Sequence, residues 1–371
     1  MREHYDFAVI GAGIAGASVA AELASDASVV LLDKEPQPGY HSTGRSAAYF
    51  SASYGSAAVR AATAASEPFF RSPPEGFTGA RLLRSRDTLF VARQNQLPRL
   101  SAFKEEISGL LEISGSDAIL RVPILDAGSV AAGLLETGGG DLDVDATLRG
   151  FLRLLHQRSG VLHCQQEVQA LSKQSGGWLV TTADGEFACE TLINAAGCWA
   201  GELGRLAGLS DLGITPRRRT ALLLRLPAQL FDADWPLVVD IDEEFYFKPD
   251  AGLLLLSPAD ETPSVACDAQ PEEWDIAVAM DRFQRASTLR ISRIEHKWAG
   301  LRSFATDREF VVGFDPRDNG FFWLAGQGGY GVQTAPGLAK LSASLLLNEA
   351  DRLPEQMAPY VELLSPERLT E

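Results

Sequence analysis

Residues 5–35 read "YDFAVIGAGIAGASVAAELASDASVVLLDKE", and this stretch decides the fold. The apolar run at 7–10 predicts a strand, the glycines after it a tight turn, and the alanine-rich run that follows a helix. Gly11 permits the turn, Gly13 lets backbone N–H groups approach a pyrophosphate, and Gly16 lets helix and strand pack closely. The stretch therefore predicts a unit that binds a dinucleotide at a helix N-terminus.

A carboxylate stands where the second strand of this unit ends. Asp33 follows the strand expected at 29–32 and lies 22 residues beyond Gly11. An acidic residue at about this spacing accepts hydrogen bonds from the ribose of the bound adenosine. A glycine-rich turn that only served packing would not explain this carboxylate.

A second glycine-rich turn decides between flavin and nicotinamide. Residues 320–334 read "GFFWLAGQGGYGVQT", an apolar run that ends in closely spaced glycines, and a helix is expected from Thr334. The N-terminus of that helix suits a flat ring that becomes negative when it accepts electrons. A nicotinamide becomes neutral on reduction and needs no such partner, so we expect FAD.

Composition excludes two classes of partner. The chain of 371 residues is 46% hydrophobic, and its 33 basic and 49 acidic side chains give a formal charge of -16. Such a charge repels nucleic-acid phosphates and anionic lipid headgroups. No run approaches the roughly 20 apolar residues of a membrane span, so we expect no stable membrane insertion.

Cysteine and histidine usage predicts no metal site. The four cysteines show no CxxC spacing, and the five histidines form no ligand pattern with them. Free buried thiols are typical of a reducing compartment, so we expect a cytoplasmic protein.

Five strings in the same order carry a family resemblance over nearly the whole chain. They are "VIGAGIAGAS", "QPGYHSTGRSAA", "FYFKPDAG", "WAGLRSF" and "QGGYGVQT". With them the chain resembles the FAD-dependent amine oxidoreductases typified by D-amino acid oxidase, glycine oxidase and sarcosine oxidase. Within that group it is most similar to the bacterial D-arginine dehydrogenases.

The resemblance implies an α/β fold that is discontinuous in sequence. Residues 1–80, 141–214 and 299–371 are expected to form a Rossmann-like FAD-binding domain. Residues 81–140 and 215–298 are expected to form a substrate-binding domain with a mostly antiparallel sheet, and the alternating pattern of 215–298 agrees.

The resemblance also implies which residues contact FAD. The loop "HSTGRSAA" should lie along the pyrophosphate and the ring, and the backbone of Val168 should meet the adenine. The whole expected set is Gly11, Gly13, Ile14, Ala15, Gly16, Asp33, Lys34, Ser42, Thr43, Arg45, Ser46, Ala48, Val168, Ala196, Gly197, Trp199, Arg302, Gly328, Gly329, Tyr330, Gly331 and Gln333. No cysteine follows Cys267 to tether the flavin, so the FAD is expected to be non-covalent.

Five residues match positions that handle the amino acid in the family. Arg302 should bind the α-carboxylate through paired charge-assisted hydrogen bonds, with Arg219 as a second pocket arginine. Tyr246 and Tyr54 should lie by the carboxylate and over the substrate, and the carbonyl of Gly329 should accept from the amine. For Arg219, Arg302 and Tyr246, solvated or core roles remain as alternatives.

The side-chain pocket departs from the D-arginine dehydrogenases. Their glutamate for the substrate guanidinium aligns with Thr88, and Asp87 beside it should point to the opposite face of its strand. Tyr49 replaces a pocket histidine, and Glu244 could restore a carboxylate. From Thr88 we expect neutral, apolar or aromatic D-amino acids to match or exceed D-arginine.

The function expected is oxidative deamination of D-amino acids. A hydride would leave Cα for flavin N5, water would hydrolyse the imine to a 2-oxo acid and ammonia, and a quinone-type acceptor would take the electrons. A glycine- or sarcosine-type oxidase and a 2-hydroxy acid dehydrogenase are alternatives on the same scaffold. A non-enzymatic flavin redox sensor is a third possibility, but it would need no carboxylate clamp. The oligomeric state is left open.

Overall fold

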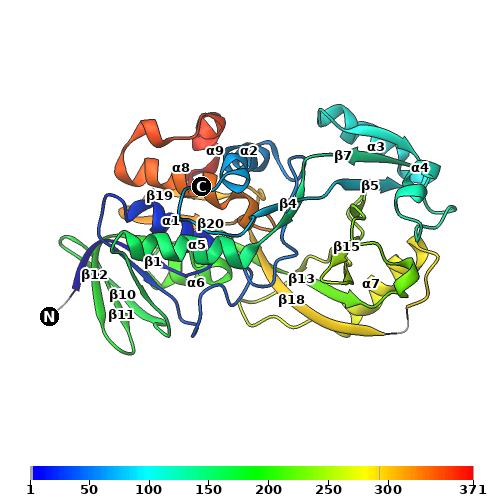
Figure 1. Ribbon diagram of the computed structural model, residues 1–371. Coiled ribbons are helices and arrows are strands. Elements are labelled where there is room, and N and C mark those ends of the chain that lie inside the picture. The colour runs from blue at the N-terminus through cyan, green and yellow to red at the C-terminus, as the bar shows by residue number, and fades with distance from the viewer. Residues whose placement is uncertain (1–2, 292, 371) are drawn as a thin grey trace.

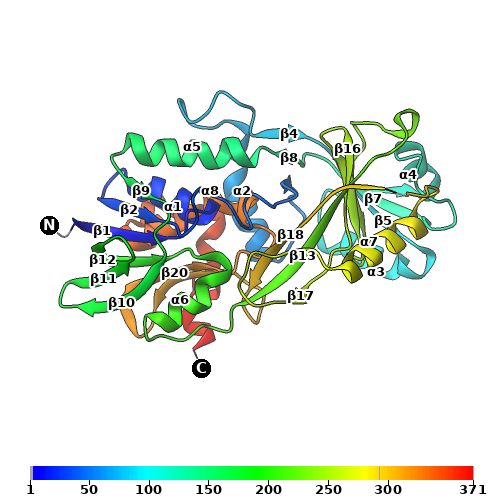
Figure 2. The same ribbon diagram turned by 90° about the horizontal axis from the view of Figure 1, so that it is seen from below.

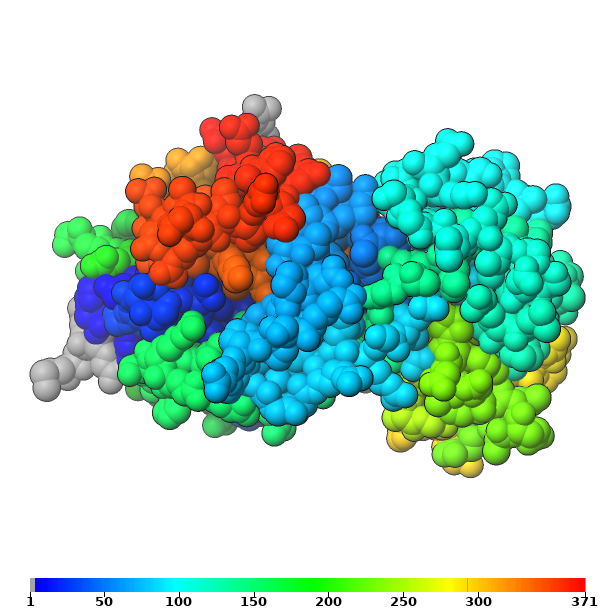
Figure 3. Space-filling view, turned by 45° about the horizontal axis from the view of Figure 1, so that its top comes forward, coloured from blue at the N-terminus to red at the C-terminus, as the bar shows by residue number. Residues whose placement is uncertain are grey.

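The computed structural model describes residues 3–291 and 293–370 and shows two bodies side by side. Both termini belong to one body, at the left of Figure 1, and β13 and β18 extend from it into the other. The view from below shows the same two long strands crossing between the bodies (Figure 2). On the surface the segment near residues 60–80 covers the region between them (Figure 3).

An eight-stranded sheet forms the centre of the first body. Its main path runs β10 (Val168–Gln174), β11 (Gly177–Thr182), β12 (Glu186–Asn194), β1 (Glu3–Ile10), β2 (Val29–Leu32) and β9 (Val161–His163), while β20 (Asp318–Ala325) pairs with β12 and with β19 (Val311–Asp315). The pairings β20–β12, β12–β1, β1–β2 and β2–β9 are parallel. A parallel sheet covered on both faces needs continuous apolar strands, and β2 is buried throughout. The Rossmann-like α/β fold expected from residues 5–35 is confirmed.

Helices and small elements cover both faces of this sheet. The helices of the body are α1 (Ile14–Leu23), α2 (Ala57–Arg71), α5 (Val144–Gln157), α6 (Ala200–Leu206), α8 (Gly331–Leu347) and α9 (Val361–Leu364). Val9 and Leu31 pack into the core that holds α1, α2, α5 and α8, while Ala8 and Val30 pack on the opposite side. A Cβ on Gly16 would lie 1.8 Å from the carbonyl oxygen of Gly11, so only glycine allows α1 to pack this close to the turn.

A nine-stranded, mostly antiparallel sheet forms the second body. Its path runs β17 (Thr262–Pro263), β13 (Thr215–Leu224), β16 (Leu253–Ser257), β15 (Tyr246–Asp250), β14 (Leu237–Asp240), β5 (Thr88–Ala92), β7 (Ala132–Glu136) and β6 (Leu111–Ser114), with β18 (Ile294–Phe304) also paired to β13. Only β14 and β5 pair in parallel among the described strands of this sheet. Its helices are α3 (Leu97–Glu106), α4 (Gly115–Arg121) and α7 (Glu273–Ala286).

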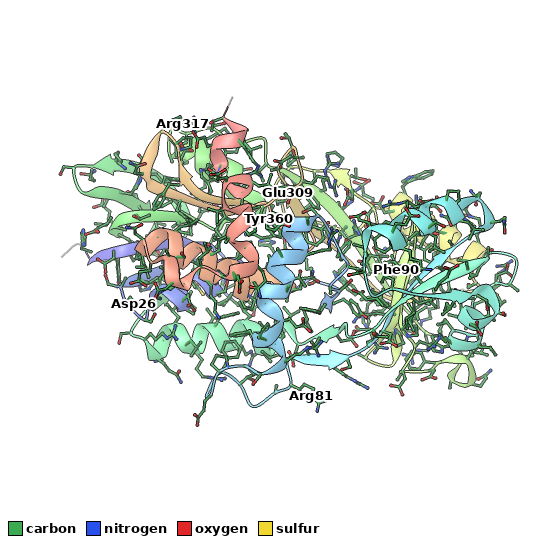
Figure 4. The ribbon with its side chains drawn as sticks, turned by 90° about the horizontal axis from the view of Figure 1, so that it is seen from above. Asp26, Arg81, Phe90, Glu309, Arg317 and Tyr360 are labelled. Carbon is green, nitrogen blue, oxygen red and sulfur yellow. The ribbon has the colours of Figure 1, made fainter. Side chains whose placement is uncertain are left out.

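A small three-stranded sheet lies where the two bodies meet, as the position of β4 shows (Figure 1). It holds β3 (Tyr49–Phe50), β8 (Gly140–Leu142) and β4 (Leu83–Ser85). Glu309 lies near the start of α2, where the bodies meet, whereas Phe90 belongs to the second body (Figure 4). Ser56 Oγ donates to the Glu309 carboxylate at 2.8 Å. We propose the two bodies as the expected domains, although β18 runs across the boundary placed at residue 298.

Among the helices of the described residues, none combines the length and the apolar character that crossing a membrane requires.

Candidate active site

One cavity of about 430 Å³ collects residues from both sheets. Small-molecule sites usually fall in this size range. The predicted cofactor residues in its wall are Gly11, Gly13, Ile14, Ala15, Asp33, Lys34, Ser42, Thr43, Arg45, Ser46, Val168, Ala196, Gly197, Trp199, Arg302, Gly328, Gly329 and Gly331. Arg219 and Tyr246 of the second sheet line the same cavity, so the proposed cofactor and substrate residues share one space.

The glycine-rich turn and Asp33 are joined by direct hydrogen bonds. Ala12 N donates to one carboxylate oxygen of Asp33 at 2.6 Å, and Glu35 N donates to the other at 2.8 Å. Burial outweighs these two bonds and raises the pKa of the Asp33 carboxyl above its ordinary value. The carboxylate thus lines the cavity with each oxygen held by a backbone N–H group.

The segment 39–47 packs its hydroxyl groups on neighbouring backbone. Thr43 Oγ1 accepts from Ile14 N at 3.0 Å, at the start of α1, and Ser42 Oγ donates to Leu301 O at 2.6 Å. Ser46 Oγ accepts from Ala48 N at 3.0 Å. These hydrogen bonds hold the segment 39–47 against the N-terminus of α1, beside the glycine-rich turn.

The guanidinium of Arg45 is bonded to protein groups, and its contact with the cofactor stays a prediction. Its guanidinium donates to Ala269 O at 2.9 Å and to Ala299 O at 3.0 Å, and it also pairs with Asp268. Its donors are therefore directed at protein acceptors of the second body rather than held open for a phosphate. Arg45 lines the cavity, but its main contacts join the 39–47 segment to the loop before α7.

A cation and an aromatic ring meet at the Asp33 part of the wall. Lys34 Nζ lies 3.3 Å from the centroid of the Trp199 ring, within the range of a cation–π contact. Gln166 N donates to Asp33 O at 2.8 Å, which brings Val168 close to this part of the cavity. The proposed adenosine end therefore combines a carboxylate, a cation and a large ring.

Four of the expected cofactor residues lie outside the cavity wall: Gly16, Ala48, Tyr330 and Gln333. Gln333 is buried and exchanges hydrogen bonds with the backbone of Ser51 while donating to Thr63 Oγ1 at 2.8 Å. The Tyr330 ring packs edge-on against Tyr54 with 4.8 Å between centroids. Gln333 and Tyr330 therefore pack behind the cavity wall, where they contact Ser51, Thr63 and Tyr54.

Arg302 on β18 is the guanidinium best placed to receive an anion. Its Nη1 donates to the Tyr54 hydroxyl at 3.4 Å, and it forms no ion pair with an Asp or Glu among residues 3–291 and 293–370. Burial opposes its charge, but Tyr54 and Tyr246 outweigh burial and raise the pKa of the guanidinium, so Arg302 stays protonated. Enclosed cations are normally paired, so this one is suited to an incoming carboxylate.

Gly329 makes room for this guanidinium. A Cβ built on Gly329 would lie 2.7 Å from Arg302 Nη1 and 2.8 Å from its Cζ. The guanidinium of Arg302 therefore lies directly against the backbone of residue 329, and a Cβ at this position would force the guanidinium to shift.

We expect Gly329→Ala to lower kcat/KM about 10- to 100-fold while FAD stays bound, because the new methyl group displaces Arg302 by roughly 1 Å. Steady-state kinetics with the best substrate measure this. Gly185→Ala is the matched control, since a Cβ at that position meets nothing within 4 Å. Equal kinetics in the two variants would contradict the placement of Arg302.

Arg219 differs from Arg302 because it already has a counterion. Its Nη2 donates to Glu261 at 3.1 Å and its Nε to Asp260 O at 2.8 Å. Burial raises the pKa of the Glu261 carboxyl, but Arg308 and Arg219 outweigh burial and hold it below its ordinary value. Arg219 lines the cavity as predicted, yet its charge is compensated.

Tyr246 lines the cavity together with the two arginines. Burial alone would raise the pKa of its hydroxyl, but the charges of Arg302 and Arg219 and a hydrogen bond with Ser257 outweigh burial and lower it. The hydroxyl is therefore polarised as a donor toward an anion in the cavity.

The predicted side-chain pocket is only partly assembled. Thr88 Oγ1 donates to the Tyr49 hydroxyl at 3.1 Å, so these two residues meet as expected. Glu244 does not join them, because Arg93 Nη2 donates to its carboxylate at 2.9 Å; this corrects the expectation for Glu244. The side chain of Asp87 has no described contact that brings it to the pocket.

Sequence reasoning missed Glu136, which the structure places directly opposite Thr88. The two residues are partners on the antiparallel strands β5 and β7. Glu136 is buried with an exposed fraction of 5%. In the sequence it lies in the plain stretch "LLETGGG", and only the pairing of strands shows its position.

Comparison with known proteins decides the family. The profile described as "FAD dependent oxidoreductase" matches residues 6–345. The chain belongs to this family. It is 25% identical to the glycine oxidase of Geobacillus kaustophilus (strain HTA426), over 97% of both chains.

Solved structures agree with this fold. The crystal structure of glycine oxidase from Geobacillus kaustophilus superposes with a TM-score of 0.80 at 23% identity, covering 93% of this chain and 95% of that one. L-proline dehydrogenase from P. horikoshii gives a TM-score of 0.83 at 21% identity, covering 99% and 98%. This oxidoreductase therefore binds FAD, and the cavity wall described above fits that group: a glycine turn, a ribose carboxylate and a second glycine-rich turn.

Proposed function

We propose that the protein oxidises an α-amino acid, bound with its carboxylate on Arg302, and that it takes the D-enantiomer. The observation that carries this proposal is the enclosed guanidinium of Arg302 in the wall of the FAD cavity, which forms no ion pair with any Asp or Glu of the described parts of the chain. The resemblance to D-amino acid oxidases and dehydrogenases supports the choice of enantiomer.

The residues of the chain would bind and orient the substrate. Arg302 would hold the carboxylate with two parallel hydrogen bonds, and the hydroxyl groups of Tyr246 and Tyr54 would donate from either side. The carbonyl of Gly329 would accept from the amine and so fix the direction of the Cα–H bond. Bound FAD supplies the acceptor for the hydride that leaves Cα.

No general base is needed in this proposal. If the amine is neutral when bound, its lone pair assists the loss of hydride and an imino acid forms. Water hydrolyses the imino acid to a 2-oxo acid and ammonia. We propose a quinone-type acceptor for the electrons, and a non-covalent FAD because no cysteine follows Cys267.

Two other reactions are compatible with the same site. A glycine- or sarcosine-type amine oxidase is supported by the glycine oxidase relatives. A 2-hydroxy acid dehydrogenase would use the same carboxylate clamp with a hydroxyl in place of the amine. A redox sensor without substrate is disfavoured, since it gives no role to an open guanidinium beside the flavin site.

A panel of substrates tests the proposal. We expect turnover with D-amino acids and a dye acceptor, at least tenfold faster in kcat/KM than with the L-enantiomers, glycine, sarcosine or 2-hydroxy acids. Repeating the best case in air separates a dehydrogenase, which needs the dye, from an oxidase. Faster turnover of sarcosine or glycine than of any D-amino acid would favour the amine oxidase instead.

A further inference from the structure

We propose that Glu136 recognises the substrate side chain, and that the enzyme therefore prefers amino acids whose side chain ends in a cation, an ammonium or a guanidinium group. This inference rests on the proposed function, because it assumes an amino acid held by its carboxylate at Arg302. It assigns a specificity role to a residue that lies on a strand at the far side of the nine-stranded sheet.

The strand register places Glu136 on the same face of the sheet as Tyr246, which lines the cavity, although Glu136 itself is not part of the cavity wall. Tyr246 on β15 pairs with Val239 on β14. Leu237, two residues before Val239, points to the same face, and it pairs with Thr88, which pairs with Glu136. Paired residues on adjacent strands share a face, so Tyr246 and Glu136 point to the same side of the sheet.

Glu136 carries a carboxylate without a cationic partner. Ser51 Oγ donates to one oxygen at 2.7 Å and Ser53 N to the other at 2.8 Å. No Lys, Arg or His in the described parts of the chain forms an ion pair with it, although only 5% of the residue is exposed. A carboxylate offers about four acceptor positions, so two remain for a ligand.

The cations nearest to this pocket are already committed. Lys248 Nζ lies 2.7 Å from Asp141, and Arg86 Nε lies 2.8 Å from the same carboxylate. Asp141 is opposite Tyr49 in the small sheet, so this group borders the pocket. Both cations share the carboxylate of Asp141, and neither forms a described ion pair with Glu136.

One short turn connects this carboxylate with the proposed substrate site. Ser53 N donates to Glu136, and the next residue, Tyr54, accepts from Arg302 through its hydroxyl. Ser51 is held by Gln333 in the first turn of α8, two residues beyond Gly331 of the cavity wall. A substrate on Arg302 would extend its side chain along this turn toward Glu136, Tyr49 and Thr88.

This placement changes the expectation drawn from Thr88. With Thr88 alone the pocket lacked a carboxylate, which favoured neutral side chains. With Glu136 beside Thr88, a cationic side chain gains a charge-assisted bond that an apolar side chain of equal length cannot make.

The first arm of the test needs no variant. D-lysine and D-norleucine both have an unbranched side chain of four carbons. Only lysine carries an ammonium group at its end. We expect the FAD-loaded wild type to oxidise D-lysine with a kcat/KM at least tenfold above that of D-norleucine. If the wild type prefers L-enantiomers, the same comparison is made with the L-pair. Equal values for the two substrates would overturn the proposal.

The second arm uses Glu136→Gln, which keeps the size and one acceptor of the side chain. We expect the lysine-to-norleucine ratio of kcat/KM to fall at least tenfold, and the same for Glu136→Leu if the first variant does not fold. Glu244→Gln is the matched control, because Arg93 holds that carboxylate elsewhere, and its ratio should match the wild type.

Two outcomes separate the possible failures. If Glu136→Gln lowers kcat/KM equally for both substrates, Glu136 only anchors the turn at 51–53, and the specificity role is overturned while the proposed function stands. If no amino acid of either hand reduces the flavin, the proposed function itself fails and this inference fails with it.

Discussion

Replacement of Arg302 by methionine is expected to lower kcat/KM about 100-fold or more while FAD remains bound. Arg302 has no carboxylate partner among the residues that the structure describes, so its interaction with a substrate carboxylate is lost outright. Removing one partner of an enclosed, hydrogen-bonded charge pair costs about 3 kcal/mol or more, which corresponds to the expected factor. Methionine keeps the unbranched stem of the side chain but lacks the guanidinium that lies against Gly329.

The matched control for Arg302→Met is Arg225→Met. Arg225 is an exposed arginine directly after β13, and its Nε lies 2.8 Å from the carboxylate of Glu295. Its substitution should leave kcat/KM within about twofold of the wild type, because surface ion pairs contribute little. Near-wild-type kinetics in Arg302→Met would move the carboxylate site to another residue, with Arg219 the next to test.

The second large effect is expected from Gly13→Val, which should abolish FAD binding without unfolding the chain. Gly13 has φ of −71° and ψ of −178°, a conformation that valine adopts. A Cβ there meets a single atom within 4 Å, Thr43 Oγ1 at 3.2 Å, yet residue 13 lines the cavity. The valine side chain would therefore occupy space that the pyrophosphate needs.

FAD content per protein, read from the visible and ultraviolet absorbance of purified protein, checks this expectation. We expect more than a tenfold loss in Gly13→Val and none in Gly79→Val, an exposed glycine whose Cβ would meet nothing within 4 Å. Circular dichroism should show that both variants are folded. Full FAD content in folded Gly13→Val would place the pyrophosphate elsewhere.

Local patterns allowed the fold to be predicted where neighbours in sequence are neighbours in space. The turn at Gly11, the helix α1, the strand before Asp33 and the glycines at 326–331 each depend on a few adjacent residues. Their steric and dipolar requirements are visible in the sequence itself. The cavity wall built from them agrees with that expectation.

Partners far apart in sequence could not be predicted. Arg45 bonds to groups 223, 224 and 254 residues away, and Arg219 meets Glu261 42 residues later. Glu136 reaches Thr88 only because β7 pairs with β5. Such contacts depend on strand order and register, which the pattern of residues within one segment does not specify. The side-chain pocket was therefore the part of the site most open to error.

The measurement that tests the central claim most directly is an anaerobic titration of the purified yellow protein with single amino acids, followed by the visible absorbance of the flavin. We predict that D-amino acids bleach this absorbance stoichiometrically with release of a 2-oxo acid, and that their L-enantiomers do so at least tenfold more slowly. An FAD-loaded protein that no amino acid bleaches would contradict the account.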